Sequence, residues 1–598
     1  MLDPFKIYKN IGFSVAAIVL LNVVEITSFT DRKSDPIMGG AIARAEPPDS
    51  LLPIESSGIQ ISQRVSPPIP QPPLPSEPLP PPEEILIPTE PPEELDITPP
   101  EGETIFFIES FEIEGNTVFS DLEITEALSA FIGRELTFVE LLEIRSIITA
   151  LYADEGYVSS GAIIPPQRIT AGQLKIQIVE GRLEEIEIVG NRRLRSNYIR
   201  RRLALAGSAP LNINRLLEGV QLLRLDPLIE NISGELQVGN SPETRRLVVT
   251  VTEADSFTIS TNLDNARVPS VGTFRRQLLV EEGNLTGLGD RITGIYTNTD
   301  GSSIFDFNYI LPLNASNGTL SAGFGIGRSR IITEPFDRLG ITSASTYYRL
   351  SYRQPLILTP RQEFAFGLTF SWQDSQTELD IDDIGPFPLS PGSDDRGSTR
   401  IAAMRFFQEW TTRSERHVLA LRSQLSVGLN ELFNASSNPE PPDNNFYTWR
   451  GQGQWVHLLA PDTVSVVRGD IQLADRPLVP LEQIGLGGAT TVRGYRQEAL
   501  LTDNGALLSA EVQIPVVRVP AVSGILHLIP FVDFGVGWNE RDLDLEENLL
   551  VGTGLGLSWQ MSDRFTARID WGIPLTDLSS DGDSWQENGI YFSIFTKF

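Results

Sequence analysis

The C-terminal part of the chain is patterned as a succession of alternating strands. From about residue 255 onward, apolar side chains recur at every second position between polar turns, and helical spacing is absent. One strand carries Phe364, Phe366, Leu368, Phe370 and Trp372 on one face, and Glu363, Ala365, Gly367, Thr369, Ser371 and Gln373 on the other. An apolar face opposite a small or polar face is typical of a membrane barrel, which meets lipid outside and water inside. A soluble sandwich would carry bulky side chains on its inward faces.

About sixteen such strands can be counted between residue 255 and the C-terminus. Bacterial outer-membrane barrels have an even number of strands, long loops at the outer end and short turns at the inner end. The longest segments between strands are 376–397, 434–445 and 476–504. The pattern predicts a mainly β protein, with a 16-stranded antiparallel transmembrane β-barrel over residues 255–598.

A different pattern occupies residues 104–254, where strands alternate with amphipathic helices. A strand near residues 105–116 precedes two helices, and each helix opens with a capping box, Ser120 with Glu123 and Thr137 with Glu140. Two further strands are expected near residues 158–164 and 174–179.

This order of elements recurs once. Glu-Ile-Glu-Gly-Asn at residues 112–116 returns as Glu-Ile-Val-Gly-Asn at residues 187–191, a spacing of 75 residues (190 − 115) between Gly115 and Gly190. The second copy predicts helices at 197–206 and 213–225 and strands at 232–238 and 246–251. Two α+β domains are therefore expected, over residues 104–181 and 182–254.

The first hundred residues consist of two further segments. An apolar run at residues 11–24, with Lys6 and Lys9 before it and small residues at 41–45 after it, predicts a signal peptide over residues 1–45. Residues 46–103 are rich in proline, which removes backbone donors, so this tract is expected to be a disordered linker that joins neither a sheet nor a helix. An alternative role for the tract is a ligand of a proline-binding domain.

Composition excludes several classes of function. The chain has 78 acidic and 47 basic residues, a net charge of −31, which would repel nucleic acid. It contains no cysteine, so disulfides and thiolate metal sites are excluded. No later apolar run is long enough for a membrane helix, so a membrane role would require strands.

A glycine-rich loop and a later strand carry the strongest candidate site. The loop contains Val492, Arg493, Gly494 and Tyr495. In the strand, Val532, Phe534 and Val536 would face lipid, which turns Phe531, Asp533 and Gly535 toward the lumen. A single lumenal carboxylate and a single loop arginine suggest a loop that folds into the barrel and is held there by an ion pair. A solvent-exposed Arg-Gly turn with an unrelated aspartate is the alternative interpretation.

These features resemble those of a known family. The Val-Arg-Gly-Tyr loop and its aspartate-bearing strand resemble the Omp85 superfamily, and more narrowly the outer-membrane transporters of two-partner secretion (TpsB; FhaC/ShlB/HecB type). The two repeated domains resemble POTRA domains. The first resembles the POTRA domain of those transporters through a set of motif residues, Gly156, Tyr157, Pro165, Pro166, Gln167, Glu180 and Gly181. The final alternating strand, ending in Phe598, is similar to the signal by which outer-membrane barrels are recognised for insertion.

The resemblance implies a function. Such a chain would lie in the outer membrane of a Gram-negative-type bacterium with its POTRA domains in the periplasm. It would secrete a TpsA-like exoprotein, related to haemolysins or haemagglutinins, whose N-terminal secretion domain docks on the POTRA edges by strand addition. Its other partners would be outer-membrane lipid and the barrel-assembly machinery. The family often has an N-terminal plug helix. Residues 46–66 have a poor helical pattern, which Pro53 interrupts, so the sequence does not decide whether this chain has a plug helix.

Motifs for chemistry are absent. There is no Gly-x-Ser-x-Gly elbow, no phosphate-binding loop, and no metal-ligand spacing among His417, His457 and His527, which predicts no enzyme activity, no cofactor and no metal. The acidic segment 380–383 is expected to be a solvated loop, with calcium binding as an alternative. Without a nucleotide site, export would be driven by folding of the exoprotein outside the cell. Three alternatives stay open: a barrel-assembly factor of the same superfamily, a passive porin, and a soluble adhesin.

Overall fold

The computed structural model describes most of the chain from residue 105 onward. The described residues are 86–88, 105–241, 243–381, 384–429, 435, 441–540, 548–578, 582 and 584–598. The expected signal peptide, most of the expected linker, the segment considered for a plug and part of the acidic segment 380–383 lie outside them. Among the described helices, none is long and apolar enough to cross a membrane.

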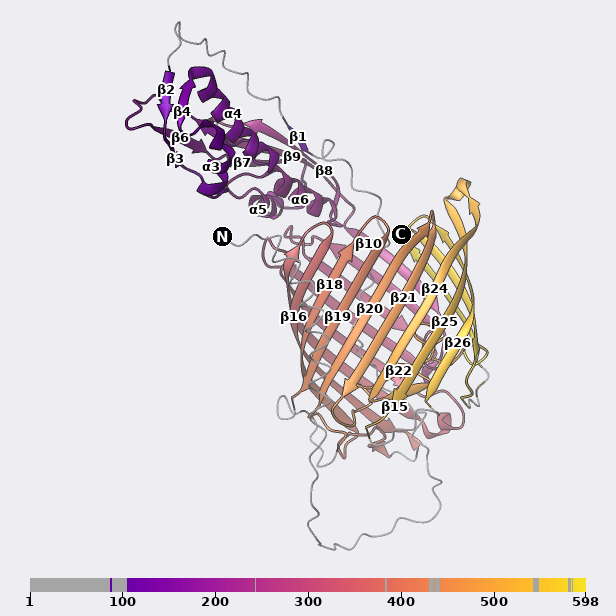
Figure 1. Cartoon of the computed structure of the whole chain (residues 1–598). Coiled ribbons are helices and arrows are strands. Elements are labelled where there is room, and N and C mark those ends of the chain that lie inside the picture. The colour runs from indigo at the N-terminus through magenta and orange to yellow at the C-terminus, as the bar shows by residue number, and fades with distance from the viewer. Residues whose placement is uncertain are drawn as a thin grey trace, which may run out of the picture. The chain divides into compact units, whose positions relative to one another are not determined.

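The C-terminal part of the chain closes into an antiparallel barrel of sixteen long strands, with the two-residue strand β17 (Gly385–Pro386) attached to β16 (Figure 1). Closure joins the first strand, β10 (Phe257–Asp264), to the last, β28 (Ile590–Lys597). The strands between them are β11 (Arg275–Gly283), β12 (Arg291–Asn298), β13 (Ser302–Pro312), β14 (Thr319–Arg330), β15 (Ile341–Leu358), β16 (Gln362–Leu379), β18 (Ser398–Arg413), β19 (His417–Gly428), β20 (Tyr447–Ala460), β21 (Thr463–Ala474), β24 (Asn504–Val519), β25 (Gly524–Trp538), β26 (Leu549–Met561) and β27 (Phe565–Pro574). The predicted fold class and strand number are confirmed.

Burial follows the predicted alternation along the barrel strands. On β16, Leu368 is 45% exposed, whereas the next residue, Thr369, which points to the opposite face, is 8% exposed. On β19, Leu421 is 38% exposed and Gln424 is 5% exposed. Large apolar side chains therefore cover the outside of the barrel, and polar side chains lie inside it.

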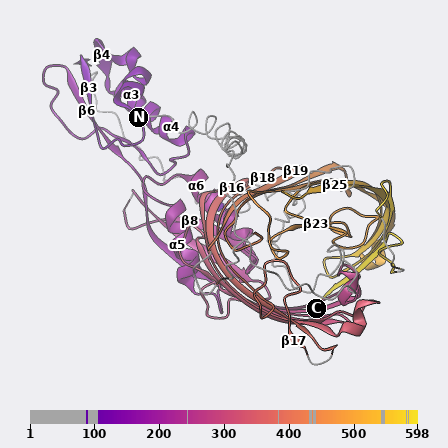
Figure 2. The same ribbon diagram turned by 90° about the horizontal axis from the view of Figure 1, so that it is seen from below.

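The connections between strands differ in length at the two ends of the barrel. At one end they are short, as at residues 313–318, 359–361 and 461–462. At the other end most are long, apart from residues 299–301, and the longest is loop 475–503 between β21 and β24. This loop contains a small hairpin of β22 (Ile484–Leu486) and β23 (Leu500–Thr502). Figure 2, a view from below, shows β23 inside the ring of barrel strands.

The first N-terminal unit contains two small sheets and two helices. The helices are α3 (Asp121–Ala127) and α4 (Phe138–Asp154), and both predicted capping boxes are present at their starts. One sheet has the order β3–β6–β5, formed by β3 (Ser110–Glu114), β5 (Gly161–Ile163) and β6 (Gln173–Val179). The single strand expected at residues 105–116 is divided into β2 (Ile105–Ile108) and β3, and β2 pairs with an unpredicted strand, β4 (Arg134–Thr137). Helix propensity around the second capping box hides β4 in the sequence.

The second unit repeats the arrangement as β7 (Arg182–Val189), α5 (Ser196–Ala206), α6 (Ile213–Arg224), β8 (Ile229–Val238) and β9 (Thr244–Glu253). Its helices pack against the sheet through a core that includes Ile199, Leu203, Leu216 and Val220. The expectation that the proline-rich tract joins no sheet is wrong. Residues of β1 (Leu86–Pro88) pair in parallel with β8, so the sheet order is β1–β8–β9–β7. Three residues with one terminal proline can pair at a sheet edge, because edges tolerate a missing donor.

Candidate functional site

In the structure, the guanidinium of Arg493 is surrounded by hydrogen-bond acceptors of the barrel wall. Arg493 Nε donates to Asp533 Oδ2 at 2.7 Å and Nη2 donates to Asp533 Oδ1 at 2.8 Å, a bidentate pair. Its Nη1 donates to Glu511 Oε2 at 2.9 Å, and its Cζ lies 3.5 Å from the centroid of the Phe531 ring. The side chains of Arg493 and Asp533 are 3% and 0% exposed. The backbone N–H of Arg493 also donates to Asp533, at 3.0 Å, so both main chain and side chain are held.

Further charged residues, which the sequence reasoning did not single out, extend this cluster. Arg568 Nη2 donates to Glu511 Oε2 at 2.9 Å, and Arg568 Nε donates to Asp570 Oδ2 at 2.7 Å. Both lie on β27, and Glu511 lies on β24. Their signal in the sequence is a charged residue at a lumen-facing position of an otherwise small or apolar strand. Because Glu511 and Asp570 each face more than one arginine, the cluster has little excess charge to leave uncompensated.

Glycines allow the loop backbone to touch the barrel wall. Gly494 has a φ of +108°, which L side chains rarely adopt. A Cβ on Gly552 of β26 would lie 1.9 Å from the carbonyl oxygen of Arg493, and a Cβ on Gly572 of β27 would lie 2.4 Å from the nitrogen of Gly494. A Cβ on Gly535 would lie 2.7 Å from Cγ2 of Val492. The small lumenal residues of β25–β27 therefore form the surface on which the loop tip rests.

Packing and hydrogen bonds hold the residues on either side of Arg493. Val492 is fully buried, and the hydroxyl of Tyr495 lies 2.9 Å from the carbonyl oxygens of Val551 and Thr576. Both side chains belong to an apolar cluster between the loop and the wall, consisting of Ile484, Leu486, Val492, Tyr495, Leu500, Leu507 and Leu550. The loop tip, defined here as residues 492–495, is thus fixed by charge, packing and close backbone contact together.

The first part of loop 475–503 is held on another stretch of wall. Arg405 of β18 donates to both carboxylate oxygens of Glu482, at 3.0 and 2.6 Å, and these side chains are 18% and 13% exposed. Beside this pair a crevice of about 270 Å³ runs between the loop and the wall formed by β13–β16, β18 and β19, where Arg349 and Arg353 line it. Water therefore reaches this attachment, which we call the loop root.

The POTRA motif residues lie in two places in the first unit. The side-chain amide of Gln167 donates to the carbonyl of Lys175 at 2.6 Å and accepts from its N–H at 2.9 Å, as a neighbouring strand would. Glu180 accepts from the N–H of Thr117 at 2.7 Å and from the hydroxyl of Tyr152 at 3.0 Å. Burial, and then the bond to Glu180, raises the pKa of the Tyr152 phenol, so this buried contact stays protonated.

The motif glycines lie where the first unit meets the second. The carbonyl of Gly156 accepts from the N–H of Ile213 at 2.8 Å, and the carbonyl of Gly181 accepts from the N–H of Leu211 at 2.7 Å. The amide of Asn212, the residue that caps α6, donates to the carbonyl of Glu155 at 2.9 Å. A Cβ on Gly156 would lie 2.6 Å from the Asn214 amide nitrogen.

Of the remaining predicted site residues, Tyr157, Pro165 and Pro166 lie beside those just described, and Phe598 lies in the barrel. Tyr157 stacks edge-on to Tyr152 with ring centroids 6.0 Å apart. Pro165 and Pro166 follow the end of β5 and precede Gln167. Phe598 is 74% exposed at the end of the barrel, and its N–H donates to the carbonyl of Ile259 at 2.9 Å. Among the described residues, no three His, Cys, Asp or Glu side chains form a group that could hold a metal ion.

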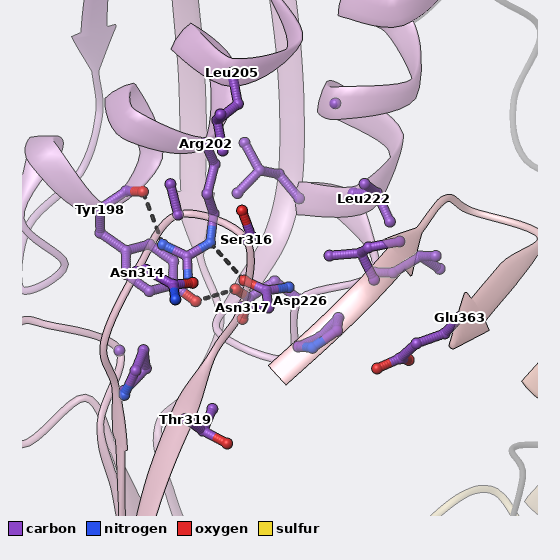
Figure 3. Close-up of a pocket in the computed structure, with 18 of the residues that line it drawn as sticks. Tyr198, Arg202, Leu205, Leu222, Asp226, Asn314, Ser316, Asn317, Thr319 and Glu363 are labelled. Carbon is purple, nitrogen blue, oxygen red and sulfur yellow. Dashed lines mark hydrogen bonds between the residues drawn. The ribbon is translucent and has the colours of Figure 1, made fainter. Parts of the chain in front are cut away.

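A pocket of about 990 Å³ lies between the second unit and the short turns of the barrel (Figure 3). Arg202 of α5 donates through Nε to the Asn317 Oδ1 at 2.9 Å, and its Cζ lies 3.6 Å from the centroid of the Tyr198 ring. The Tyr198 hydroxyl donates to Asp226 Oδ2 at 2.5 Å. Leu205 and Leu222 add apolar surface, so the pocket is lined by mixed chemistry.

Family models match this arrangement in both parts of the chain. A model described as haemolysin secretion/activation protein ShlB/FhaC/HecB matches residues 243–559, which is more than half of the chain. A model described as POTRA domain, ShlB-type, matches residues 106–181. The matches thus fall on the barrel and on the first unit.

Individual relatives agree with the family models. The heme/hemopexin transporter protein HuxB of Haemophilus influenzae strain 86-028NP is 21% identical over 499 residues, which cover 78% of this chain and 82% of that protein. The outer membrane transporter CdiB of Escherichia coli is 23% identical over 486 residues, which cover 79% of each. The solved structure of CdiB from Escherichia coli has the same fold, with a TM-score of 0.65 at 20% identity over 84% of this chain and 93% of that one. The chain belongs to the haemolysin secretion/activation protein family ShlB/FhaC/HecB and is an outer-membrane β-barrel transporter that secretes a partner exoprotein.

Proposed function

We propose that the pair Arg493–Asp533 keeps loop 475–503 in the position that secretion requires. The observation that carries this proposal is the complete burial of a charged, five-donor side chain in the lumen of the barrel. A charge buried so deeply is stable only in one arrangement, because removal of a partner leaves the other unpaired. The loop tip is therefore a fixed part of the lumen, and an exoprotein would pass beside it.

In this proposal the exoprotein first docks on the two N-terminal units, taken as POTRA domains over residues 104–181 and 182–254. An extended segment adds to an open sheet edge by main-chain hydrogen bonds. The edges are β3 and β5 in the first unit and β7 in the second, whereas β1 covers the edge of β8. Docking on β8 therefore requires displacement of β1.

The pocket beside Arg202 is the proposed entrance to the barrel. It adjoins the short turns of the barrel, and two of its lining residues, Thr319 and Arg353, also line the lumenal crevice at the loop root. The proposal assigns no catalytic step and no bound cofactor to the chain. Folding of the exoprotein outside supplies the driving force, and secretion by the reconstituted transporter without ATP is the expected result; a strict requirement for ATP would contradict it.

Secretion by paired lumenal variants tests the role of the loop. Arg493→Ala should leave the barrel inserted but stop export of the exoprotein encoded beside the transporter. The matched control is Arg450→Ala, which removes a bidentate lumenal pair with Asp470, at 2.9 and 2.7 Å; within the described residues, the hydrogen bonds of this pair do not reach the loop. Export should persist in this control. Normal export by Arg493→Ala would remove the loop tip from the mechanism.

Depletion of the protein separates secretion from barrel insertion, the alternative activity within the superfamily. If the chain were an insertion factor, depletion should lower the levels of other outer-membrane barrels while the exoprotein is still exported. A transporter should show the opposite result.

A further inference from the structure

The closure seam of the barrel is extended by one buried side chain. Backbone pairing between β10 and β28 covers Ser260 to Asp264 against Ser593 to Lys597. Beyond it, the amide of Asn265 donates to the carbonyl of Ile590 at 2.9 Å and accepts from the N–H of Phe592 at 2.9 Å. Asn265 is 2% exposed, so its side chain continues the seam as an additional strand residue would.

Gln586 joins this seam to the locked loop. Its side chain is fully buried, and its Nε2 donates to the carbonyls of Asn265 and, at 2.9 Å, of Arg267. Its Oε1 accepts from the backbone N–H of Gln497, two residues beyond the loop tip, at 2.9 Å. One amide group therefore bonds the connection after the first strand and loop 475–503 at once.

The last strand holds the loop tip through a second residue. Tyr591 of β28 is 1% exposed, and its hydroxyl accepts from the N–H of Gly494 at 2.9 Å and donates to the carbonyl of Tyr495 at 2.6 Å. The position of β28 is itself set by its pairing with β10. Displacement of β28 would thus withdraw the hydrogen-bond partner of Gly494 and Tyr495 in the loop tip.

We propose that Gln586 is a positioning residue that couples closure of the seam to locking of the loop. Loss of its amide leaves two carbonyls and one N–H buried without partners, and each such group is costly. The loop is then locked only in a barrel whose first and last strands are joined. Because coupling is reciprocal, the locked loop also stabilises the seam. The inference rests on the role proposed above for the loop tip.

A cysteine reporter at Thr491 measures the locked state directly. The chain has no cysteine, so a single introduced thiol is the only target of a maleimide. Thr491 precedes the tip, and within the described residues its buried hydroxyl has no hydrogen-bond partner, so Thr491→Cys removes no bond. The purified full-length transporter is treated with a membrane-impermeant maleimide. Unheated samples are then separated by gel electrophoresis, and labelling is measured only in the band of the folded protein.

The variants Gln586→Leu and Asn265→Leu should each raise the labelling rate about tenfold. Asn265 is decisive, because its side-chain bonds go to β28 and none of the described ones reaches loop 475–503. The matched control is Asn444→Leu, a 1% exposed asparagine whose amide donates to the carbonyls of Ala402 and Leu429 on another stretch of wall. This control should label at the parent rate.

Three results would overturn the proposal. Asn265→Leu at the parent rate would show that the seam does not act on the loop. An equal rise in Asn444→Leu would show a general loosening of the barrel. In the Arg493→Ala background, where the tip is already free, Gln586→Leu should add little to the labelling rate. A full multiplicative increase of that rate would mean that the two residues act independently.

Gln586→Glu keeps the acceptor for Gln497 but loses the donor to the seam, and it is used if the leucine variant fails to fold. Labelling needs no exoprotein, so failure here is distinguishable from failure of the secretion role.

Discussion

Loop 475–503 is attached at its tip and at its root by an arginine–carboxylate pair. At the tip, Arg493 and Asp533 are 3% and 0% exposed and lie within a wider cluster of charges. At the root, Arg405 and Glu482 are 18% and 13% exposed and border an open crevice. Both pairs are bidentate. The two attachments therefore differ in their access to water and much less in their hydrogen bonds.

This difference indicates which attachment can be released. Separation at the tip would leave buried charges unpaired, which costs about 3–5 kcal/mol. Separation at the root lets water replace part of the lost interaction, so it should cost less than separation at the tip. Movement of the loop would then begin at the root, while the tip stays on β25–β27.

The largest effect is expected at the tip. Arg493→Ala should destabilise the barrel by about 3–5 kcal/mol, because Asp533 and Glu511 lose a common buried partner. The measurement is the temperature at which the folded band disappears in gel electrophoresis, compared with Arg450→Ala. A fall no larger than in that control would mean that the tip is not a special attachment.

Gly494→Ala should be the next most damaging change. The residue has a φ of +108°, and a Cβ would lie 2.9 Å from the nitrogen of Pro574, so strain and backbone contact add together. A loss on the order of 1–3 kcal/mol is expected. The control is Gly294→Ala on β12, where a Cβ would meet nothing within 4 Å. Equal stability of the two variants would contradict the close fit of the tip.

Glu482→Gln at the root should have a small effect on stability, about 1 kcal/mol or less, because water can solvate Arg405. Its effect on the lumen should be clearer. With the pair weakened, conductance of the transporter in a planar bilayer should rise, whereas Asp470→Asn, which weakens the Arg450 pair, should leave it unchanged. A large loss of stability in Glu482→Gln would make the root as rigid as the tip.

Ionic strength should produce the smallest and most selective difference. Salt screens pairs that water reaches and has little influence on buried ones. Labelling of a cysteine that replaces Leu481, beside the root, should therefore quicken between low and high salt, while labelling of Thr491→Cys should not change. A similar salt response at both positions would show that the tip is also open to water.

Alternation and spacing predicted the architecture because each strand of a membrane barrel must sort its side chains by itself. Lipid lies against residues such as Leu368, and the lumen lies against their neighbours, such as Thr369. The polarity of each position can therefore be seen within the single strand. The capping boxes at Ser120 and Thr137 are local for the same reason. Strands β1 and β4 were missed because both form only against a distant partner.

For the candidate site too, the sequence predicted some residues and the tertiary structure added others. Parity along one strand indicated that Asp533 points inward, and the resemblance supplied Arg493 as its partner. The remaining partners come from strands that no local pattern connects: Glu511 from β24, Arg568 from β27 and Tyr591 from β28. Gln586 could not be predicted either, because the partners in its three hydrogen bonds lie more than 80 residues away from it in the chain.

The sequence alone determined the class of the protein, namely a barrel with two repeated α+β units before it and one arginine-bearing loop. Only the tertiary structure decided how that loop is held and which of its attachments water can reach. The physical reason is that hydrophobic periodicity is a property of a single strand. Burial of a charge, in contrast, depends on which strands the closed barrel brings around it.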